Sequence, residues 1–250
     1  MRAVQRPMRH RSVPPDSSAT APAQPAEVAN AVDVVRLAAQ IDHTVLRPEA
    51  QPSDIVRACR VARDLACAGI CINPIHVARA KQLLEGSAVK VVAVIGFPFG
   101  ATYTAVKALE AELAVRDGAD ELDVVLPIGS LKNGELDVVE ADIAAVVRSA
   151  AGRPVKVVLE CGLLTDDEKR EAVRIAVRAG AAFVKTSTGF LGSGATIHDV
   201  TVLTQAAGGA IAVKATGGIR FYEDAMALIG AGASRLGTSA TEAVLASRPL

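Results

Sequence analysis

The chain has 250 residues, half of them apolar, and Lys+Arg and Asp+Glu number 27 each. With no net charge, the chain as a whole is not attracted to nucleic acid or to anionic lipid. With 5 Phe, 2 Tyr and no Trp, the sequence also argues against a base-stacking surface. The length fits one large domain with a substantial core.

The N-terminal residues 1–26 are rich in Arg, Pro and Ala, with four arginines before the first acidic residue, Asp16. Such a composition predicts a disordered extension, and an Arg-rich transit peptide is the alternative. We expect the folded domain to occupy residues 27–250. Glu27 to Gln40 has helical periodicity and predicts an extra helix before the main repeat.

Short apolar strands then alternate with longer helical segments. The expected strands are Ile41 to Val45, Gly69 to Asn73, Val89 to Phe97, Glu121 to Val125, Val155 to Cys161, Phe183 to Thr186, Ala210 to Lys214 and Ser234 to Leu236. The expected helices are Gln51 to Ala68, Pro74 to Leu84, Tyr103 to Asp117, Leu136 to Ala151, Thr165 to Ala179, Ile197 to Ala207, Phe221 to Gly230 and Thr238 to Leu245.

Eight strand–helix units at regular spacing predict a parallel sheet closed as a single (β/α)8 TIM barrel, with the extra N-terminal helix added. A doubly wound open sheet is the alternative. No G-x-G-x-x-G motif follows the first strand, so the dinucleotide-binding form of that fold lacks its fingerprint.

Polar residues interrupt the apolar strands at positions that alternation directs into the barrel. They are Asp42, Thr44, Cys71, Asn73, Glu121, Asp123, Lys156, Glu160, Lys185 and Lys214. Buried charges must pair with one another, so structural ion pairs are the alternative to a catalytic role for any one of them. Their presence on six strands favours an active site inside the barrel.

Lys185 and Lys214 each follow a short apolar run on two consecutive expected strands and are expected side by side. An uncharged lysine amine is a nucleophile for carbonyls. Two ammonium groups ~5 Å apart at an effective dielectric of ~20 repel by roughly 3 kcal/mol, which lowers the pKa of one by about two units. One lysine would therefore be the nucleophile and the other its activator, in either order. Asp123, on another strand, could serve as the proton shuttle.

Glycine- and hydroxyl-rich loops follow the last three strands, where barrels often hold a phosphate; ordinary turns are the alternative. We expect the substrate and its phosphate to be bound by Thr186, Thr188, Gly189, Gly217, Gly218, Gly237, Thr238 and Ser239, with Cys71 and Asn73.

The histidines, the cysteines and the apolar runs indicate no further functional site. His43 is interpreted as a packing or hydrogen-bonding residue, and His10, His76 and His198 share no metal-ligand spacing with it, so we expect neither metal nor cofactor. The four cysteines form no C-x-x-C pair, which indicates a reduced, cytoplasmic protein. No apolar run approaches the ~18 residues of a membrane helix, so we expect no membrane partner.

Six segments together resemble the deoxyribose-phosphate aldolase family. They are Ile41 to Thr44, Ile70 to Pro74, Val94 to Pro98, Gly118 to Asp123, Val184 to Gly189 and Lys214 to Arg220, in order along residues 41–239. The resemblance implies a class I aldolase, acting in deoxyribonucleoside catabolism, that reversibly cleaves 2-deoxy-D-ribose 5-phosphate to D-glyceraldehyde 3-phosphate and acetaldehyde. The partner is then a small sugar phosphate, and we expect a homo-oligomer, either a dimer or a tetramer.

The resemblance also implies roles. Lys185 forms the Schiff base, Lys214 tunes it, and Asp123 donates and accepts the proton, with Asp42 supporting the network and Lys156 in the proton relay. Two positions depart from the pattern of some members: Phe190 stands where they carry a phosphate-binding lysine, and the chain ends without their C-terminal tyrosine. Another Schiff-base sugar-phosphate aldolase and a non-catalytic sugar-phosphate binding protein are the rival functions.

Overall fold

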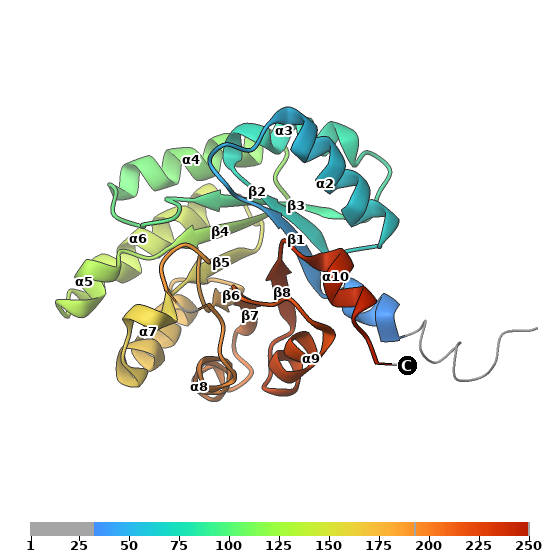
Figure 1. Cartoon of the computed structure of the whole chain (residues 1–250). Coiled ribbons are helices and arrows are strands. Elements are labelled where there is room, and N and C mark those ends of the chain that lie inside the picture. Colours follow the sequence, from blue (N-terminus) through green and yellow to red (C-terminus); the bar gives the residue numbers. More distant parts are fainter. Residues whose placement is uncertain (1–32, 193, 250) are drawn as a thin grey trace, which may run out of the picture.

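Eight parallel strands form a closed barrel in the computed structural model, which describes residues 33–192 and 194–249 (Figure 1). Each strand pairs with the next, and β8 pairs back with β1. The strands are β1 (Ile41–Val45), β2 (Gly69–Ile72), β3 (Lys90–Ile95), β4 (Glu121–Val125), β5 (Val155–Val158), β6 (Phe183–Lys185), β7 (Ala212–Thr216) and β8 (Arg235–Thr238). The predicted (β/α)8 barrel is confirmed.

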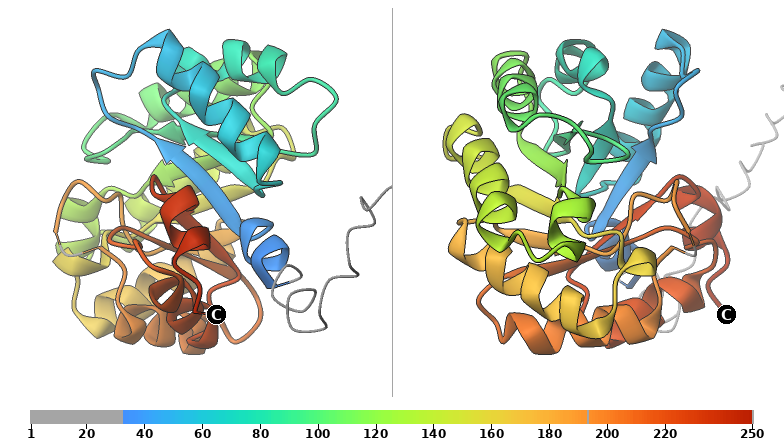
Figure 2. Two further views of the ribbon diagram at one scale, coloured as in Figure 1. Left: turned by 45° about the vertical axis from the view of Figure 1, so that its right-hand side comes forward. Right: turned by 90° about the vertical axis from the view of Figure 1, so that its left-hand side faces the viewer.

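Helices surround the barrel, as the two views of Figure 2 show. They are α2 (Pro52–Asp64), α3 (Val77–Leu83), α4 (Thr104–Arg116), α5 (Ile128–Lys132), α6 (Leu136–Ser149), α7 (Asp166–Arg178), α8 (Ile197–Ala207), α9 (Tyr222–Gly230) and α10 (Thr241–Ala246), with short 3-10 turns at Pro74–His76 and Cys161–Leu163. Of the extra helix expected over residues 27–40, the described part is helical over 33–38.

The predicted N-terminal extension over residues 1–26 lies outside the described residues, as does His10. The division at residue 27 therefore stays a prediction. Across the described part of the chain, no helix is both long and apolar enough to cross a membrane.

The hydrophobic core lies between the barrel and its helices. Strand residues that point outward, such as Ile70, Leu122 and Val157, pack there and are fully buried. Residues that alternate with them point into the barrel, because successive side chains of a strand face opposite sides. The barrel interior therefore holds two groups of buried side chains. One is charged: Asp42, Asp123, Lys156, Lys185 and Lys214. The other is a smaller apolar cluster that includes Cys71, Val92 and Val94.

Local sequence signals account for several boundaries. Helix α7 begins at the predicted N-cap Thr165, whose hydroxyl accepts from the Glu168 amide while the Glu168 carboxylate accepts from the Thr165 amide. This reciprocal capping satisfies two amides that the first helical turn leaves unpaired. Strands β7 and β8 run two residues further than expected, so Thr216, Gly237 and Thr238 belong to strands and not to loops.

Candidate active site

A linked cluster of charged side chains lies inside the barrel. Its members come from six strands: Asp42 (β1), Glu121 and Asp123 (β4), Lys156 (β5), Lys185 (β6), Lys214 (β7) and Arg235 (β8). Both aspartates and all three lysines are 0% exposed. The inward placement is therefore met for Asp42, Glu121, Asp123 and the three lysines. Arg235 is a member that sequence reasoning missed.

Asp123 lies at the centre of this cluster. Its Oδ2 atom accepts from Lys185 Nζ at 3.0 Å and from Lys214 Nζ at 2.8 Å, and its Oδ1 accepts from Lys156 Nζ at 2.9 Å. Burial opposes ionisation of Asp123, but these three lysines outweigh it and hold the pKa of the carboxyl well below its usual range. Asp123 is thus an ionised carboxylate in contact with every lysine of the cluster.

Lys185 and Lys214 are register partners on β6 and β7, as the sequence predicted. Their electrostatics differ from the prediction for Lys214, because carboxylates surround it. Lys214 Nζ contacts Asp42 Oδ2 at 2.6 Å as well as Asp123. Burial favours the neutral amine, yet Asp123 and Asp42 prevail and raise the pKa of Lys214 above its ordinary value. Lys214 therefore holds its proton, which disfavours the assignment in which it is the nucleophile.

Asp42 joins two cations on neighbouring strands. Its Oδ2 accepts from Lys214, and its Oδ1 accepts from Arg235 Nη1 at 2.8 Å. Burial raises the pKa of Asp42, whereas Lys214, Lys156 and Arg235 lower it and together keep it below its usual value. No larger side chain fits beside this carboxylate, because a Cβ on Gly69 would meet Asp42 Oδ1 at 2.9 Å.

Arg235 and Glu121 are the first residues of β8 and β4, and they form the end of the cluster at the N-termini of these strands. Arg235 Nη1 lies 3.3 Å from Glu121 Oε2, and Lys156 Nζ contacts the same oxygen at 2.6 Å. The guanidinium and the Lys156 ammonium also lie over the Phe183 ring, at 5.6 and 5.8 Å from its centroid. Arg235 precedes Gly237 by two residues and so shares its face of β8. The expected strand, Ser234 to Leu236, stopped short of Gly237, so no alternation in the sequence signalled Arg235.

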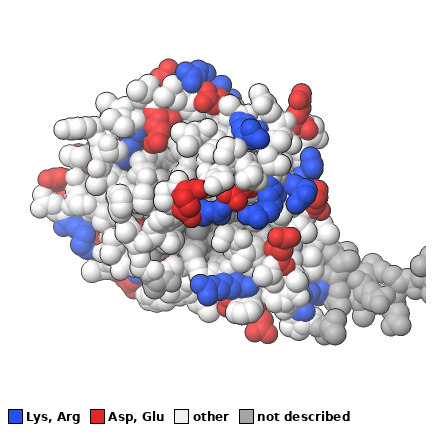
Figure 3. Space-filling model, turned by 45° about the horizontal axis from the view of Figure 1, so that its top comes forward, with Lys and Arg blue, Asp and Glu red and all other residues white. Residues whose placement is uncertain are grey.

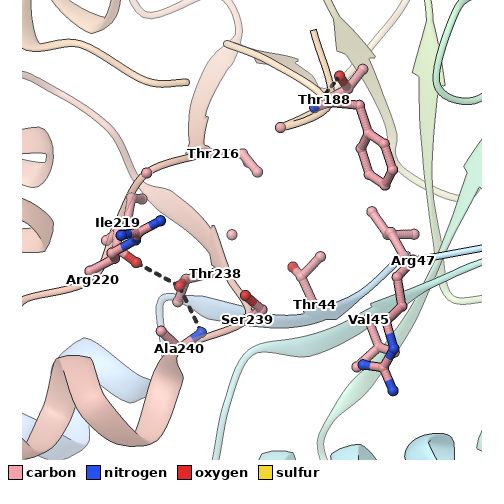
Figure 4. Close-up of a pocket in the computed structure, with 16 residues that line it drawn as sticks. Thr44, Val45, Arg47, Thr188, Thr216, Ile219, Arg220, Thr238, Ser239 and Ala240 are labelled. Atoms are coloured by element: carbon pink, nitrogen blue, oxygen red, sulfur yellow. Dashed lines mark hydrogen bonds between the residues drawn. The ribbon is translucent and has the colours of Figure 1, made fainter. Parts of the chain in front are cut away.

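A cavity of about 360 Å³ opens above the cluster (Figure 4). The ends of β6, β7, β8 and β1 line it, and the predicted residues Thr188, Gly189, Gly217, Gly218, Gly237, Thr238 and Ser239 are brought together there. Gly237 lines the cavity and also adjoins the charged cluster, because a Cβ at Gly237 would lie 3.3 Å from Lys214 Cε. The cavity thus lies next to the lysines.

Close backbone approach shapes one wall of this cavity. Gly217 has φ +98°, and a Cβ there would lie 2.7 Å from Gly194 Cα. Only glycine suits such a position. Beside it, the hydroxyls of Thr186 and Ser187 both donate to the Thr216 carbonyl. These contacts fix the loop after β6 against the end of β7.

Glu160 holds the same loop from behind. It was expected on the inward face of β5, but it lies beyond the end of that strand, at φ +55°. Its Oε2 accepts from the Thr188 amide at 2.9 Å and from the Thr188 hydroxyl at 2.5 Å. The hydroxyl in turn accepts from the Phe190 amide at 3.1 Å. Phe190 then meets Phe97 edge-on, with the ring centroids 5.3 Å apart.

Three expected binding residues do not line this cavity. Cys71 is buried inside the barrel, with Sγ 3.8 Å from Asp123 Oδ2, and Asn73 donates to the Leu46 carbonyl at 3.3 Å. Thr186 is buried against β7. His43 points outward, where Nδ1 lies 2.9 Å from Thr241 Oγ1, and burial lowers the pKa of this imidazole. The binding roles of Cys71, Asn73 and Thr186 stay predictions.

Two arginines, Arg47 and Arg220, lie on opposite sides of the cavity (Figure 4). Arg47 is ion-paired with Asp54 at 2.5 Å and with Glu49 at 3.3 Å. Among the described residues, no carboxylate pairs with the Arg220 guanidinium, although the Arg220 amide donates to Asp224. Arg220 is therefore the cation of this rim that is available to an anion.

Comparison with known proteins agrees with this geometry. Residues 36–241 match the family model described as DeoC/LacD family aldolase. A deoxyribose-phosphate aldolase from Streptococcus pneumoniae (strain CGSP14) is 49% identical over 211 residues, which span 84% of this chain and 96% of the relative.

Solved structures agree as well. A deoxyribose phosphate aldolase from Aeropyrum pernix, whose structure is described as tetrameric, superposes with a TM-score of 0.80 at 35% identity, covering 90% of this chain and 98% of the other. An aldolase designated QR15 gives a TM-score of 0.81 at 39% identity, covering 86% and 95%. The chain therefore belongs to the DeoC/LacD family of aldolases, which are carbon–carbon lyases.

Proposed function

We propose that this aldolase reversibly cleaves 2-deoxy-D-ribose 5-phosphate to D-glyceraldehyde 3-phosphate and acetaldehyde through a Schiff base on Lys185. The observation that supports this choice is the distribution of carboxylates. Among the described residues, Asp123 is the only carboxylate that pairs with Lys185, and two other lysines share it, whereas Lys214 contacts Asp42 as well. An amine attacks a carbonyl only without its proton, and Lys185 is the lysine with the least support for a charge.

The chemistry follows from the contacts of Asp123. The Lys185 amine adds to the C1 aldehyde of the open-chain sugar, and loss of water leaves an iminium. Removal of the C3 hydroxyl proton breaks the C2–C3 bond, which releases D-glyceraldehyde 3-phosphate and leaves an enamine on Lys185. Protonation at C2 and hydrolysis then release acetaldehyde. Asp123 is placed to accept and return these protons, and Lys156 and Lys214, both within 3.0 Å of it, to exchange them.

The phosphate is assigned to the cavity above the cluster. Gly217, Gly218 and Ser239 line this cavity, and their backbone amides would serve as donors. The guanidinium of Arg220, which pairs with no carboxylate among the described residues, would supply the charge that Phe190 lacks. Because Lys185 is fully buried, the aldehyde end of the sugar must displace side chains that cover the amine. A location in the cytoplasm and a role in deoxyribonucleoside catabolism stay predictions.

Borohydride reduction in the presence of 2-deoxy-D-ribose 5-phosphate tests the proposal. The reduced adduct is expected on the peptide that carries Lys185, because reduction converts the iminium to a stable secondary amine. Peptide mass mapping identifies the modified lysine. Recovery of the adduct on Lys214 would contradict the assignment, and so would the absence of any modified lysine after reduction. Omission of borohydride is the control.

We also infer that the chain forms a homo-oligomer through α4. Leu109, Val106 and Leu113 lie along the outer side of this helix and expose apolar surface, with Tyr103 at its start. Helix α4 carries apolar residues on its outer face as well as on the one against the barrel, an arrangement that favours a further partner. On the face drawn in Figure 3, acidic and basic side chains are interspersed, so this face presents no field of one sign to a second copy.

Leu109→Glu is expected to shift the protein to a smaller species, because it places a charge in the proposed contact. Sedimentation velocity at several protein concentrations measures the change. Ile197→Glu on α8 is the matched control, since Ile197 is 57% exposed and Leu109 55%, and α8 and α4 lie on different sides of the barrel (Figure 1). Equal effects of the two substitutions, or none from either, would exclude α4 as the interface.

A further inference from the structure

Three cations stand in one row across consecutive strands. Lys185 on β6 is the register partner of Lys214 on β7, and Lys214 is the register partner of Arg235 on β8. Since neighbouring strands lie ~4.8 Å apart, Lys185 and Arg235 are separated by about 10 Å along this row. Arg235 is therefore close enough for its charge to act on the chemistry at Lys185.

The charge on Arg235 is permanent. A guanidinium keeps its proton throughout the working range of proteins, and Asp42 and Glu121 raise the pKa of Arg235 further, against the opposing effect of burial. The side chain is 16% exposed and is held by Asp42, Glu121 and the Phe183 ring. Arg235 does not contact Asp123 or Lys185, so any effect on catalysis comes from its charge at a distance and from the two carboxylates that it holds.

The cluster holds four cations and three carboxylates. Asp42 is shared by Lys214 and Arg235, Glu121 by Lys156 and Arg235, and Asp123 by the three lysines. One positive charge is therefore in excess. Besides these groups, Cys71 faces the cluster, and burial raises the pKa of its thiol, so it adds no negative charge.

We propose that Arg235 is a positioning residue whose fixed charge occupies Asp42 and Glu121 and so makes Lys185 the surplus cation of the cluster. Loss of the Lys185 proton then leaves three cations opposite three carboxylates. Without Arg235 the three lysines already balance the three carboxylates, and release of a proton leaves a net negative charge. The inference rests on the proposed Schiff base at Lys185 and adds the source of its activation.

Two substitutions of opposite sign test this role. Arg235→Gln removes a positive charge, so the acidic limb of the pH profile of kcat/KM is expected to move to higher pH. Glu121→Gln removes a negative charge, so the same limb is expected to move to lower pH. A unit charge about 10 Å away at an effective dielectric of ~20 corresponds to a shift on the order of one pH unit. The double variant is expected to return the limb close to its original position.

Arg235→Lys is the matched control, because it keeps the charge and is expected to keep the pH profile. Shifts in the same direction for Arg235→Gln and Glu121→Gln, or unchanged limbs in both, overturn the inference, since a purely structural role has no dependence on sign. If Arg235→Gln does not fold, Glu121→Gln alone tests the role of Arg235. An acidic limb of kcat/KM that stays in place or moves to higher pH in Glu121→Gln then overturns the inference.

Borohydride trapping in each variant distinguishes a failure of the proposed Schiff base on Lys185 from a failure of the proposed role of Arg235. An adduct on Lys185 together with unshifted pH profiles leaves the proposed function standing and removes the role of Arg235. An adduct on another lysine removes the proposed function, whatever the pH profiles show.

Discussion

Lys185→Ala is expected to lower kcat for cleavage of 2-deoxy-D-ribose 5-phosphate by about 10⁴-fold or more, as replacement of a covalent nucleophile does in other enzymes. The alanine removes the only atom that can form the Schiff base in our proposal. Steady-state assay of aldehyde release measures the loss. Lys156 and Lys214 remain in this variant, so residual trapping by borohydride reports any substitute nucleophile.

Lys185→Arg separates the loss of the nucleophile from the loss of charge. Arginine can keep a contact with Asp123, but it stays protonated and cannot attack a carbonyl. Both variants are therefore expected to be inactive, and circular dichroism should show a folded protein for Lys185→Arg. Turnover above roughly one hundredth of the original in either variant would be incompatible with a Schiff base on Lys185.

Asp142→Ala is expected to lower the free energy of unfolding by about 3–5 kcal/mol, because it leaves a buried charge without its partner. Lys107 on α4 is 0% exposed, and its Nζ contacts Asp142 Oδ2 of α6 at 2.7 Å and the Val125 carbonyl at 2.9 Å. The Thr104 hydroxyl also donates to Asp142, at 2.7 Å. Urea unfolding monitored by circular dichroism measures the effect.

An exposed ion pair serves as the comparison. Arg174→Ala breaks the contact of Arg174 with Glu171 at 2.6 Å on the surface of α7, and a cost of no more than about 1 kcal/mol is expected from such pairs. The double change Lys107→Met with Asp142→Leu should recover part of the loss, because it removes both buried charges together. A cost for Asp142→Ala no larger than that for Arg174→Ala would show that the buried pair contributes little.

Much of the barrel was predictable because buried parallel strands have a simple pattern. Ile41–Val45, Glu121–Val125 and Ile197–Ala207 have the same bounds in the sequence and in the structure. Helix α5 (Ile128–Lys132) was not predicted, since five residues between Pro127 and Gly134 are too few for periodicity to show. Its stability comes from contacts with α6 and α7, which are invisible in the chain order.

The candidate site was predictable to the extent that it depends on strand neighbours. Register pairing of Lys185 and Lys214 followed from two consecutive strands that each carry a lysine after a short apolar run. The raised pKa of Lys214 did not follow, because Asp42 and Asp123 reach it from β1 and β4, across the barrel. Arg235 was missed because its predicted strand had three residues and gave no alternation from which to assign a face.

The sequence separations within the charged cluster have a consequence for folding. Asp42 pairs with Arg235 across 193 positions and with Lys214 across 172. These carboxylate contacts exist only after β8 has joined β1, and before that point an open sheet would enclose charges that lack partners. Contacts between distant parts of a chain form slowly, and unpaired buried charges are costly. Closure of the β1–β8 seam should therefore belong to the rate-limiting step of folding, with a half-closed barrel as a poorly populated species.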